Sequence, residues 1–223
     1  QGLVGVGLSN GQLIVLKPNY SVDVSEDSKS KSVTPSINFP YGTTPLTVND
    51  NQQALTTFTL RDDDQTLQVL AGGQQQVVWQ HFAVQKAEGE AGGLGLMSAM
   101  DDSESSEPKV FTRDINSPVV VSDNADFVVL GQGASWAYSL TKQNDIHVFK
   151  INDNQPSLYQ SLKADLQGAN ITAVTPLQGE VSLLIGDSNG TISQWFLVRD
   201  QNSVEDKFRL QKIRSFKLGT AAI

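Results

Sequence analysis

Short apolar runs separated by polar turns recur along the whole chain. One strand–turn–strand unit is written twice, in residues 4–16 (VGVGLSNGQLIVL) and in residues 183–198 (LLIGDSNGTISQWFLV). Both copies carry Ser-Asn-Gly at the turn. An Asn-Gly turn between apolar runs is a strong hairpin signal, because both residues tolerate a positive φ. The pattern therefore predicts a repeated β-hairpin.

Two divergent copies lie between these units, in residues 69–84 and 127–140, at intervals of roughly 55 to 65 residues. Each is an apolar run broken by Gly and followed by a second run. A tryptophan follows the turn in three units, and Leu16 holds the equivalent place in the first, which predicts one packing role repeated in every unit. The predicted turn and anchor residues are Asn10, Gly11, Gly72, Trp79, Gly131, Trp136, Gly186, Asn189, Gly190 and Trp195.

The predicted strands carry apolar side chains on both faces. In residues 191–198, Ile192 and Phe196 point one way while Trp195 points the other. A sheet with two buried faces needs neighbouring sheets on both sides, as in radially stacked propeller blades. The sequence therefore predicts an all-β, β-propeller-like array of about four antiparallel meander blades. Residues 1–223 form a single domain in this interpretation. Four units could close into a small ring, but we favour an arc of a larger propeller.

The blades are predicted as groups of consecutive strands. The first blade is the hairpin of residues 4–16. The second contains residues 54–60, 66–71 and 75–84. The third contains residues 110–115, 119–122, 126–130, 134–140 and 146–150. The fourth contains residues 158–162, 171–176, 181–185 and 191–198, with a further strand at 208–216.

Two segments are predicted to be connections. Residues 25–45 are rich in Ser, Thr, Pro and Lys and indicate a long loop. Residues 86–108 are Gly-rich, then acidic and Ser-rich, and predict a flexible acidic loop. The chain starts inside a strand pattern and stops on an apolar run, so we expect both ends to be boundaries within a longer protein.

Charge and composition narrow the function. Between residues 88 and 107 lie six acidic residues and no Lys or Arg, which leaves 18 acidic against 16 basic residues elsewhere. The remaining surface is nearly neutral, which gives no reason to expect nucleic acid binding. The chain has no Cys, which excludes disulfides, thiolate metal sites and a Cys nucleophile.

Few residues suggest chemistry. His81 and His147 are the only histidines and have no metal-ligand spacing. The acidic turn at residues 62–64 and the Asp187 loop lack the pattern of a calcium-binding EF-hand. GxSxG, P-loop and dinucleotide motifs are absent. We therefore expect no enzyme, no metal and no cofactor.

A basic stretch with interleaved apolar residues covers residues 207–217. It could face lipid headgroups, an anion or a partner. Lysines on an exposed edge strand also protect a sheet against aggregation, and we favour that interpretation.

Three segments together resemble a known family. Residues 171–174 (ITAV), 184–200 (LIGDSNGTISQWFLVRD) and 213–216 (IRSF) are similar to the large extracytoplasmic insertion of phosphate ABC transporter permease subunits from Gram-negative bacteria. The stretch from Gly186 to Asp200, with the pattern GDxxGxxSQWFxVRD, is the specific part.

The resemblance implies a propeller-like, non-catalytic domain on the periplasmic face of the inner membrane. It implies that the domain supports phosphate uptake by docking or regulation. Its partners would be the periplasmic phosphate-binding protein and other transporter subunits. Two alternatives stay open, a free-standing periplasmic β-propeller scaffold or assembly protein, and a propeller enzyme. An enzyme would need polar groups that converge near the propeller axis, and Asp62, His81 and Asp187 lie at unrelated places in their units.

Overall fold

The fold is all-β throughout the part of the chain that the computed structural model describes. The described residues are 2–24, 30–39, 42–62, 66–86, 109–113, 119–133, 135–177, 179, 181–200 and 207–223. They form 17 strands in four antiparallel sheets and no helix.

The sheets follow one another along the chain. Sheet one contains β1 (Val4–Gly7), β2 (Gln12–Val24), β3 (Lys31–Asn38) and β4 (Leu46–Thr47). Sheet two contains β5 (Thr57–Asp62), β6 (Thr66–Gly72), β7 (Val77–Lys86), β8 (Lys109–Arg113) and β9 (Val119–Ser122). Sheet three contains β10 (Phe127–Leu130), β11 (Trp136–Leu140), β12 (Asp145–Asn152) and β13 (Gln155–Lys163). Sheet four contains β14 (Ile171–Pro176), β15 (Ser182–Asp187), β16 (Thr191–Arg199) and β17 (Phe208–Lys217).

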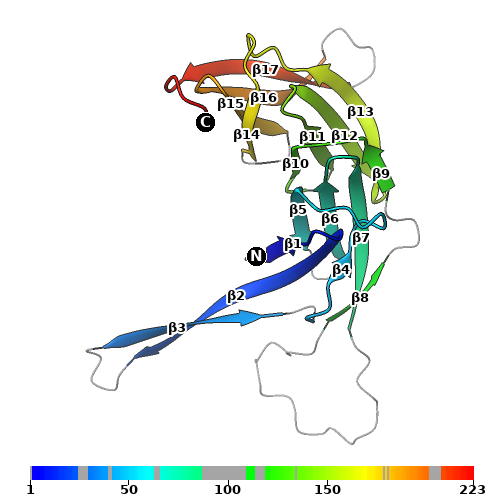
Figure 1. Cartoon of the computed structure of the whole chain (residues 1–223), viewed down its shortest axis with the longest axis vertical. Helices are drawn as coiled ribbons and strands as arrows, with labels where there is room; N and C mark the ends of the chain where they lie inside the picture. The colour runs from blue at the N-terminus through cyan, green and yellow to red at the C-terminus, as the bar shows by residue number, and fades with distance from the viewer. Residues whose placement is uncertain are drawn as a thin grey trace, which may run out of the picture.

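Each sheet is a meander, and the four sheets stand side by side in an open arc (Figure 1). β1, β5, β10 and β14 lie on the concave side, and contacts run from β1 to β5, from β5 to β10 and from β10 to β14. In sheet two the outer position is shared by β8 and β9, which pair with successive parts of β7. This arrangement of radially placed meanders is that of propeller blades, and it confirms the predicted fold class.

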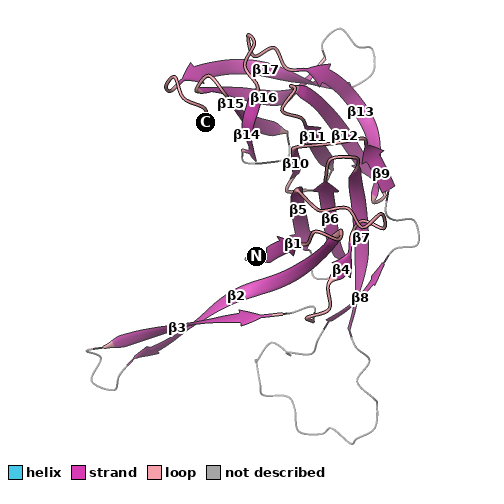
Figure 2. Cartoon of the chain, viewed as in Figure 1, coloured by secondary structure: helices cyan, strands magenta, loops and turns pink. Residues whose placement is uncertain are grey.

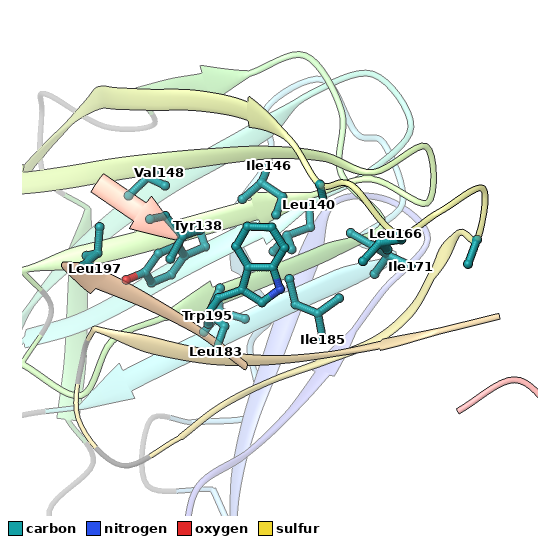
Figure 3. Close-up of a cluster of buried hydrophobic side chains, with 14 residues drawn as sticks. Tyr138, Leu140, Ile146, Val148, Leu166, Ile171, Leu183, Ile185, Trp195 and Leu197 are labelled. Carbon is teal, nitrogen blue, oxygen red and sulfur yellow. The ribbon is translucent and has the colours of Figure 1, made fainter. Parts of the chain in front are cut away.

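A separate apolar cluster fills each interface between neighbouring sheets. Leu13 and Val15 of sheet one pack with Leu67, Val69 and Phe82 of sheet two. The interface between sheets two and three is built around Trp79, Leu70 and Phe149. Trp195 lies between sheets three and four with Tyr138, Leu140 and Leu183, as Figure 3 shows.

Strand β6 shows why the sequence pattern indicated sheets buried on both faces. Leu67, Val69 and Ala71 point toward sheet one, whereas Leu70 belongs to the cluster with sheet three. Alternate residues of a strand point to opposite faces, so a strand between two neighbours has apolar residues at nearly every position. The structure thus confirms the inference from two-faced strands.

The predicted strands are present, but several were assigned to the wrong blade. β8 and β9 belong to sheet two rather than to the third blade, and β13 belongs to sheet three rather than to the fourth. The cause is the third predicted unit, residues 127–140. This unit is the hairpin of the first two strands in its sheet, whereas the Ser-Asn-Gly unit of residues 183–198 is the hairpin of the second and third strands in sheet four.

Residues 25–45 were predicted to be a loop, and this prediction is wrong for residues 31–38. These residues form β3, which pairs with the far half of β2 from Lys17↔Asn38 to Val24↔Lys31. The composition of the segment indicated a loop, but its apolar residues alternate with Ser and Thr, as in a strand with one polar face. The predicted acidic loop at 86–108 lies outside the described residues, apart from Lys86 at the end of β7.

An exposed ion pair links Asp50, which follows strand β4 of sheet one, to Arg113 at the end of strand β8 in sheet two. The Arg113 guanidinium donates to both carboxylate oxygens of Asp50, at 2.7 Å to Oδ1 and 2.6 Å to Oδ2. These hydrogen bonds, aided by the positive charge of Arg113, hold the pKa of Asp50 below its usual value of 3.8, although burial acts in the opposite sense.

The pair gives a pH-dependent prediction. Because the pKa of Asp50 is lower in the folded chain, its stabilising contribution is present above about pH 4 and disappears as the pH falls through the folded pKa. Asp50→Asn should lower the free energy of unfolding at pH 7 by less than about 1 kcal/mol, since the pair is exposed. Urea unfolding of both proteins at pH 7 and at pH 3 measures this. An equal difference at the two pH values would contradict the role of the charge.

Candidate interaction surface

The outer halves of β2 and β3 form a two-stranded arm that projects from sheet one (Figure 2). The register of this hairpin sorts its side chains by face. The pairs Val22↔Val33 and Tyr20↔Pro35 share one face, and the pairs Ser21↔Thr34 and Asn19↔Ser36 share the other. One face of the arm is therefore apolar and the other polar. We call the first the arm face, and its members are Pro18, Tyr20, Val22, Val24, Val33, Pro35 and Ile37.

The arm face is open to solvent. Tyr20, Val22, Val24, Val33 and Ile37 are between 52% and 69% exposed. An isolated two-stranded hairpin is only marginally stable in water, and contiguous exposed apolar surface on a soluble protein marks interaction sites. The arm face is therefore the strongest candidate binding surface in the described part of the chain.

The arm face continues onto sheet one. β2 is one strand, so its even-numbered residues share a face from Ile14 and Leu16 to Val24. In the register with β1, Leu16 lies opposite Val4 and Ile14 opposite Val6. Val4 and Val6 are 44% and 43% exposed and lie on the side of sheet one that faces away from sheet two. A partner can thus contact the arm and the free face of sheet one together.

The edges of the arm are less suited to binding than its face. Pro18 in β2 and Pro35 in β3 have no backbone N–H, so each edge lacks a donor. Proline on an edge strand is a known defence against unwanted strand pairing. The arm face also carries few charges, with Lys31 near the tip paired to Val24. An apolar protein surface fits this chemistry better than an anionic membrane, which attracts clustered Lys and Arg.

Sequence reasoning missed this surface. Its signal was present as the alternation of apolar and small polar residues in β3 (KSVTPSIN), with the same alternation in β2 from Pro18 to Val24. The two runs could have been matched as a hairpin by their period of two.

The predicted turn residues occupy two equivalent turns. Asn10 and Gly11 lie between β1 and β2, and Asn189 and Gly190 lie between β15 and β16. Both glycines have a φ of 78°. Gly72 ends β6, Gly131 follows β10, and Gly186 lies within β15 beneath Ile223.

The three tryptophans do not share one position. Trp79 in β7 and Trp195 in β16 lie in the third strand of their sheets, whereas Trp136 begins β11, a second strand. Trp79 and Trp195 are buried between sheets. Trp136 is half-buried beside Tyr159, with ring centroids 5.0 Å apart. The inference of one repeated tryptophan role is therefore wrong for Trp136.

The titratable candidates do not converge. His81 lies in β7 and His147 in β12, which belong to different sheets. The Asp187 carboxylate accepts the backbone N–H groups of Asn189 and Thr191, both at 2.9 Å, so it stabilises its own turn. Across the described residues, no three His, Asp or Glu side chains are close enough to share a metal ion.

The basic stretch forms β17, which is the outer edge strand of sheet four. The sequence pattern favoured an edge strand for this stretch. Beside it an open hollow is lined by Lys212, Lys217, Asp165 and Asp187. The Lys212 ammonium donates to the Asp165 carbonyl at 2.7 Å, and Lys217 donates to the carbonyl of Asn189. The two cations thus already bind carbonyl groups of this sheet and its neighbour, and the hollow has mixed charge, which does not favour an anion site.

In the described part of the chain, the sheets and the arm form an open β-propeller-like array with a projecting candidate interaction surface. No protein-family model matches the chain, and no curated protein matches it in sequence. In the described part of the chain no helix is long and apolar enough to span a membrane.

Several solved structures are similar in fold. A protein from Bacteroides uniformis, provisionally assigned as a 6-phosphogluconolactonase, is 13% identical, and the match covers 96% of this chain and 57% of that protein with a TM-score of 0.48. Sqt1 from Saccharomyces cerevisiae is 8% identical over 75% of this chain and 36% of Sqt1, with a TM-score of 0.42. The β-propeller domain of Cps50 (Swd1) from Myceliophteria thermophila is 10% identical over 96% of this chain and 68% of that domain, with a TM-score of 0.39.

The chain thus spans little more than half of the first of these proteins and about a third of the second. At these identities and TM-scores the similarities carry no conclusion about activity or partners. The description as a propeller-like array rests on the sheet order and the interfaces of the chain itself.

Proposed function

We propose that this domain is a non-catalytic docking module that binds a partner protein through the arm face. The observation that carries the proposal is the contiguous exposed apolar surface of the arm, which continues onto the free face of sheet one. The scattered positions of the titratable residues are consistent with a binding role. Exposed apolar surface of this kind is costly to keep in water and is typical of interaction sites.

The resemblance at residues 184–200 supports a finer proposal. In it the domain is the periplasmic insertion of a phosphate ABC transporter permease, at the periplasmic face of the inner membrane. The arm face would then bind the periplasmic phosphate-binding protein or a second transporter subunit. This part of the proposal is carried by the resemblance alone, whereas docking through the arm is carried by the structure.

A binding experiment with paired variants tests the docking role. Val22→Thr/Val33→Thr keeps the shape of both side chains but replaces one methyl by a hydroxyl on each strand of the arm face. We expect the affinity for the phosphate-binding protein to fall by about tenfold or more, because two hydroxyl groups would be buried in an apolar contact. Isothermal titration calorimetry with the purified domain gives the dissociation constants.

Thr34→Val is the matched control. It makes the reverse exchange on the polar face of the arm, beside Val33, and should leave the affinity unchanged. All three residues are exposed in the free chain, so both variants should unfold within about 0.5 kcal/mol of the parent. Equal affinities of the parent and Val22→Thr/Val33→Thr would exclude the arm face as the docking surface.

The sequence of the parent gene on both sides of residues 1–223 separates the transporter from the free-standing scaffold. The transporter proposal expects one apolar span of about 20 residues upstream and several downstream. A cleavable signal peptide upstream and no later span would overturn the transporter proposal and favour a free-standing propeller scaffold.

A further inference from the structure

Sheet one begins one strand later than the other sheets. The turn between β1 and β2 contains Gly11 at a φ of 78°, the turn between β15 and β16 contains Gly190 at 78°, and the turn between β11 and β12 contains Asn144 at 75°. In sheets three and four this turn connects the second strand to the third. In sheet one it connects the first strand to the second. β1 therefore corresponds to β11 and β15.

Backbone hydrogen bonds support this correspondence. After the outer strand of each sheet, the chain returns to the same turn. The Val48 N–H donates to the Gly11 carbonyl at 3.1 Å, and the Ala164 N–H donates to the Asn144 carbonyl at 2.8 Å. The Leu218 N–H donates to the Gly190 carbonyl at 2.9 Å. The three returns are equivalent, so the three sheets are in register from β1 onward.

Among the described residues, no strand of sheet one takes the place that precedes β1 in this register. β11 pairs with β10 on its inner side, β15 with β14, and β6 with β5. Within the described ranges, β1 pairs with β2 alone. The inner edge of β1 is thus open on the concave side of the arc, where β5, β10 and β14 line the other sheets (Figure 1).

The backbone groups at this edge can be assigned from the ladder. The Leu8 N–H donates to the Gln12 carbonyl at 2.8 Å, next to the pair Gly7↔Leu13. Because hydrogen-bonded residues alternate along an antiparallel pair, the amides of Val4 and Val6 point toward β2, and those of Gly5 and Gly7 point to the open edge. Neither proline nor a charged side chain protects β1.

An apolar wall lies beside the edge. A Cβ atom at Gly5 would lie 2.5 Å from Cε2 of Phe58 and 2.8 Å from Cδ2 of Leu60. Phe58 and Leu60 of β5 therefore cover the glycine face of β1, and both are only partly buried. A strand added next to β1 would place side chains opposite Gly5 and Gly7 on this same face, against Phe58.

We propose that the inner edge of β1 is a binding site for an extended polypeptide strand supplied from outside residues 1–223. The strand runs antiparallel to β1 and pairs with Gly5 and Gly7. It carries apolar residues on the face toward Phe58 and Leu60, as the inner strand β10 (FVVL) does in its own sheet. This mode is β-augmentation, in which backbone pairing gives affinity and alternate side chains give specificity. The proposal does not depend on the arm face or on the transporter.

A peptide with the sequence of residues 125–132 (ADFVVLGQ) serves as the probe. We expect about 1 mM of this peptide to slow the hydrogen exchange of the Gly5 and Gly7 amides at least tenfold, as measured by NMR. The Val4 and Val6 amides should change less, because they are already bonded to β2. The same peptide with Val129→Pro is the control and should have no effect, since proline cannot complete the ladder.

A tethered variant excludes weak affinity as the reason for a negative result. Residues 125–135 are placed directly ahead of Leu3, so that the grafted strand joins β1 as β10 joins β11. Tethering raises the effective concentration to about the millimolar range. If Gly5 and Gly7 still exchange as in the parent, the proposal is overturned.

Two further results would also overturn the proposal that the inner edge of β1 binds an external strand. Slow exchange of Gly5 and Gly7 in the peptide-free chain at every protein concentration would mean that another segment of this chain occupies the edge. Slow exchange that appears only as the protein concentration rises would mean that a second copy occupies it.

Discussion

Replacing Trp79 by alanine is expected to lower the free energy of unfolding by about 4 kcal/mol. Trp79 is fully buried at the interface between sheets two and three. Its indole Nε1 donates to the carbonyl of Asn154, in the turn between β12 and β13, at 3.0 Å. The substitution leaves a large cavity and also removes the donor for that carbonyl. Guanidinium or urea unfolding of both proteins measures the difference.

Trp136→Ala is the matched control, because it removes the same atoms from a half-buried position. Trp136 contacts Tyr159 and Phe208 by ring edges, with centroids 5.0 and 6.4 Å away. We expect a loss of about 1 to 2 kcal/mol, since solvent already reaches part of the ring. Equal losses for Trp79→Ala and Trp136→Ala would contradict the assignment of Trp79 as the residue that joins the two sheets.

Gly190→Ala should cost about 3 kcal/mol, through two separable effects. Gly190 has a φ of 78°, which an L-residue adopts at a cost of about 1 kcal/mol. An added Cβ would also lie 2.6 Å from the Ala221 carbonyl oxygen and 2.7 Å from that of Gly219. Relieving this overlap must displace the segment that folds back over the turn, which we expect to cost about 2 kcal/mol more. Thermal and urea unfolding both report the loss.

Gly168→Ala separates the two effects. Gly168 has a φ of 87°, and nothing lies within 4 Å of its added Cβ. This variant should lose about 1 kcal/mol, from the backbone conformation alone. If Gly168→Ala and Gly190→Ala lose the same amount, close packing over the Gly190 turn plays no part in stability.

The hairpins with Ser-Asn-Gly turns could be predicted because their signal is local. Two residues that tolerate a positive φ, set between apolar runs, determine the turn without reference to the rest of the fold. The equivalent turn of sheet three escaped detection because Asn144 stands where the other two turns have glycine, although its φ of 75° is close to the 78° of Gly11 and Gly190. Without that turn, the third unit was aligned one strand too early and the blade boundaries moved with it.

The candidate binding surfaces depend on strand pairings that are not local, so they are harder to predict than the turns. The arm face depends on the pairing of β2 with β3, and composition alone assigned β3 to a loop. The open edge of β1 depends on comparing four sheets in three dimensions, since the sequence of β1 (VGVG) does not indicate which of its neighbours is missing. Register and sheet order are long-range properties that local patterns determine only weakly.

The arrangement of the sheets in an open arc also predicts the order in which they unfold locally. Among the described residues, each apolar cluster joins two sheets that are neighbours in the sequence, so we treat the chain as a one-dimensional row of coupled units. Within the described residues, apolar clusters cover sheets two and three on both faces, and cover sheets one and four on one face each. Opening should therefore start at the two ends of the row and progress inward. The arm belongs to sheet one. A partner that binds the arm would therefore slow the local opening of sheet one, and the slowing would increase with the affinity of the partner. The rate of opening of sheet one would then indicate whether the partner is bound.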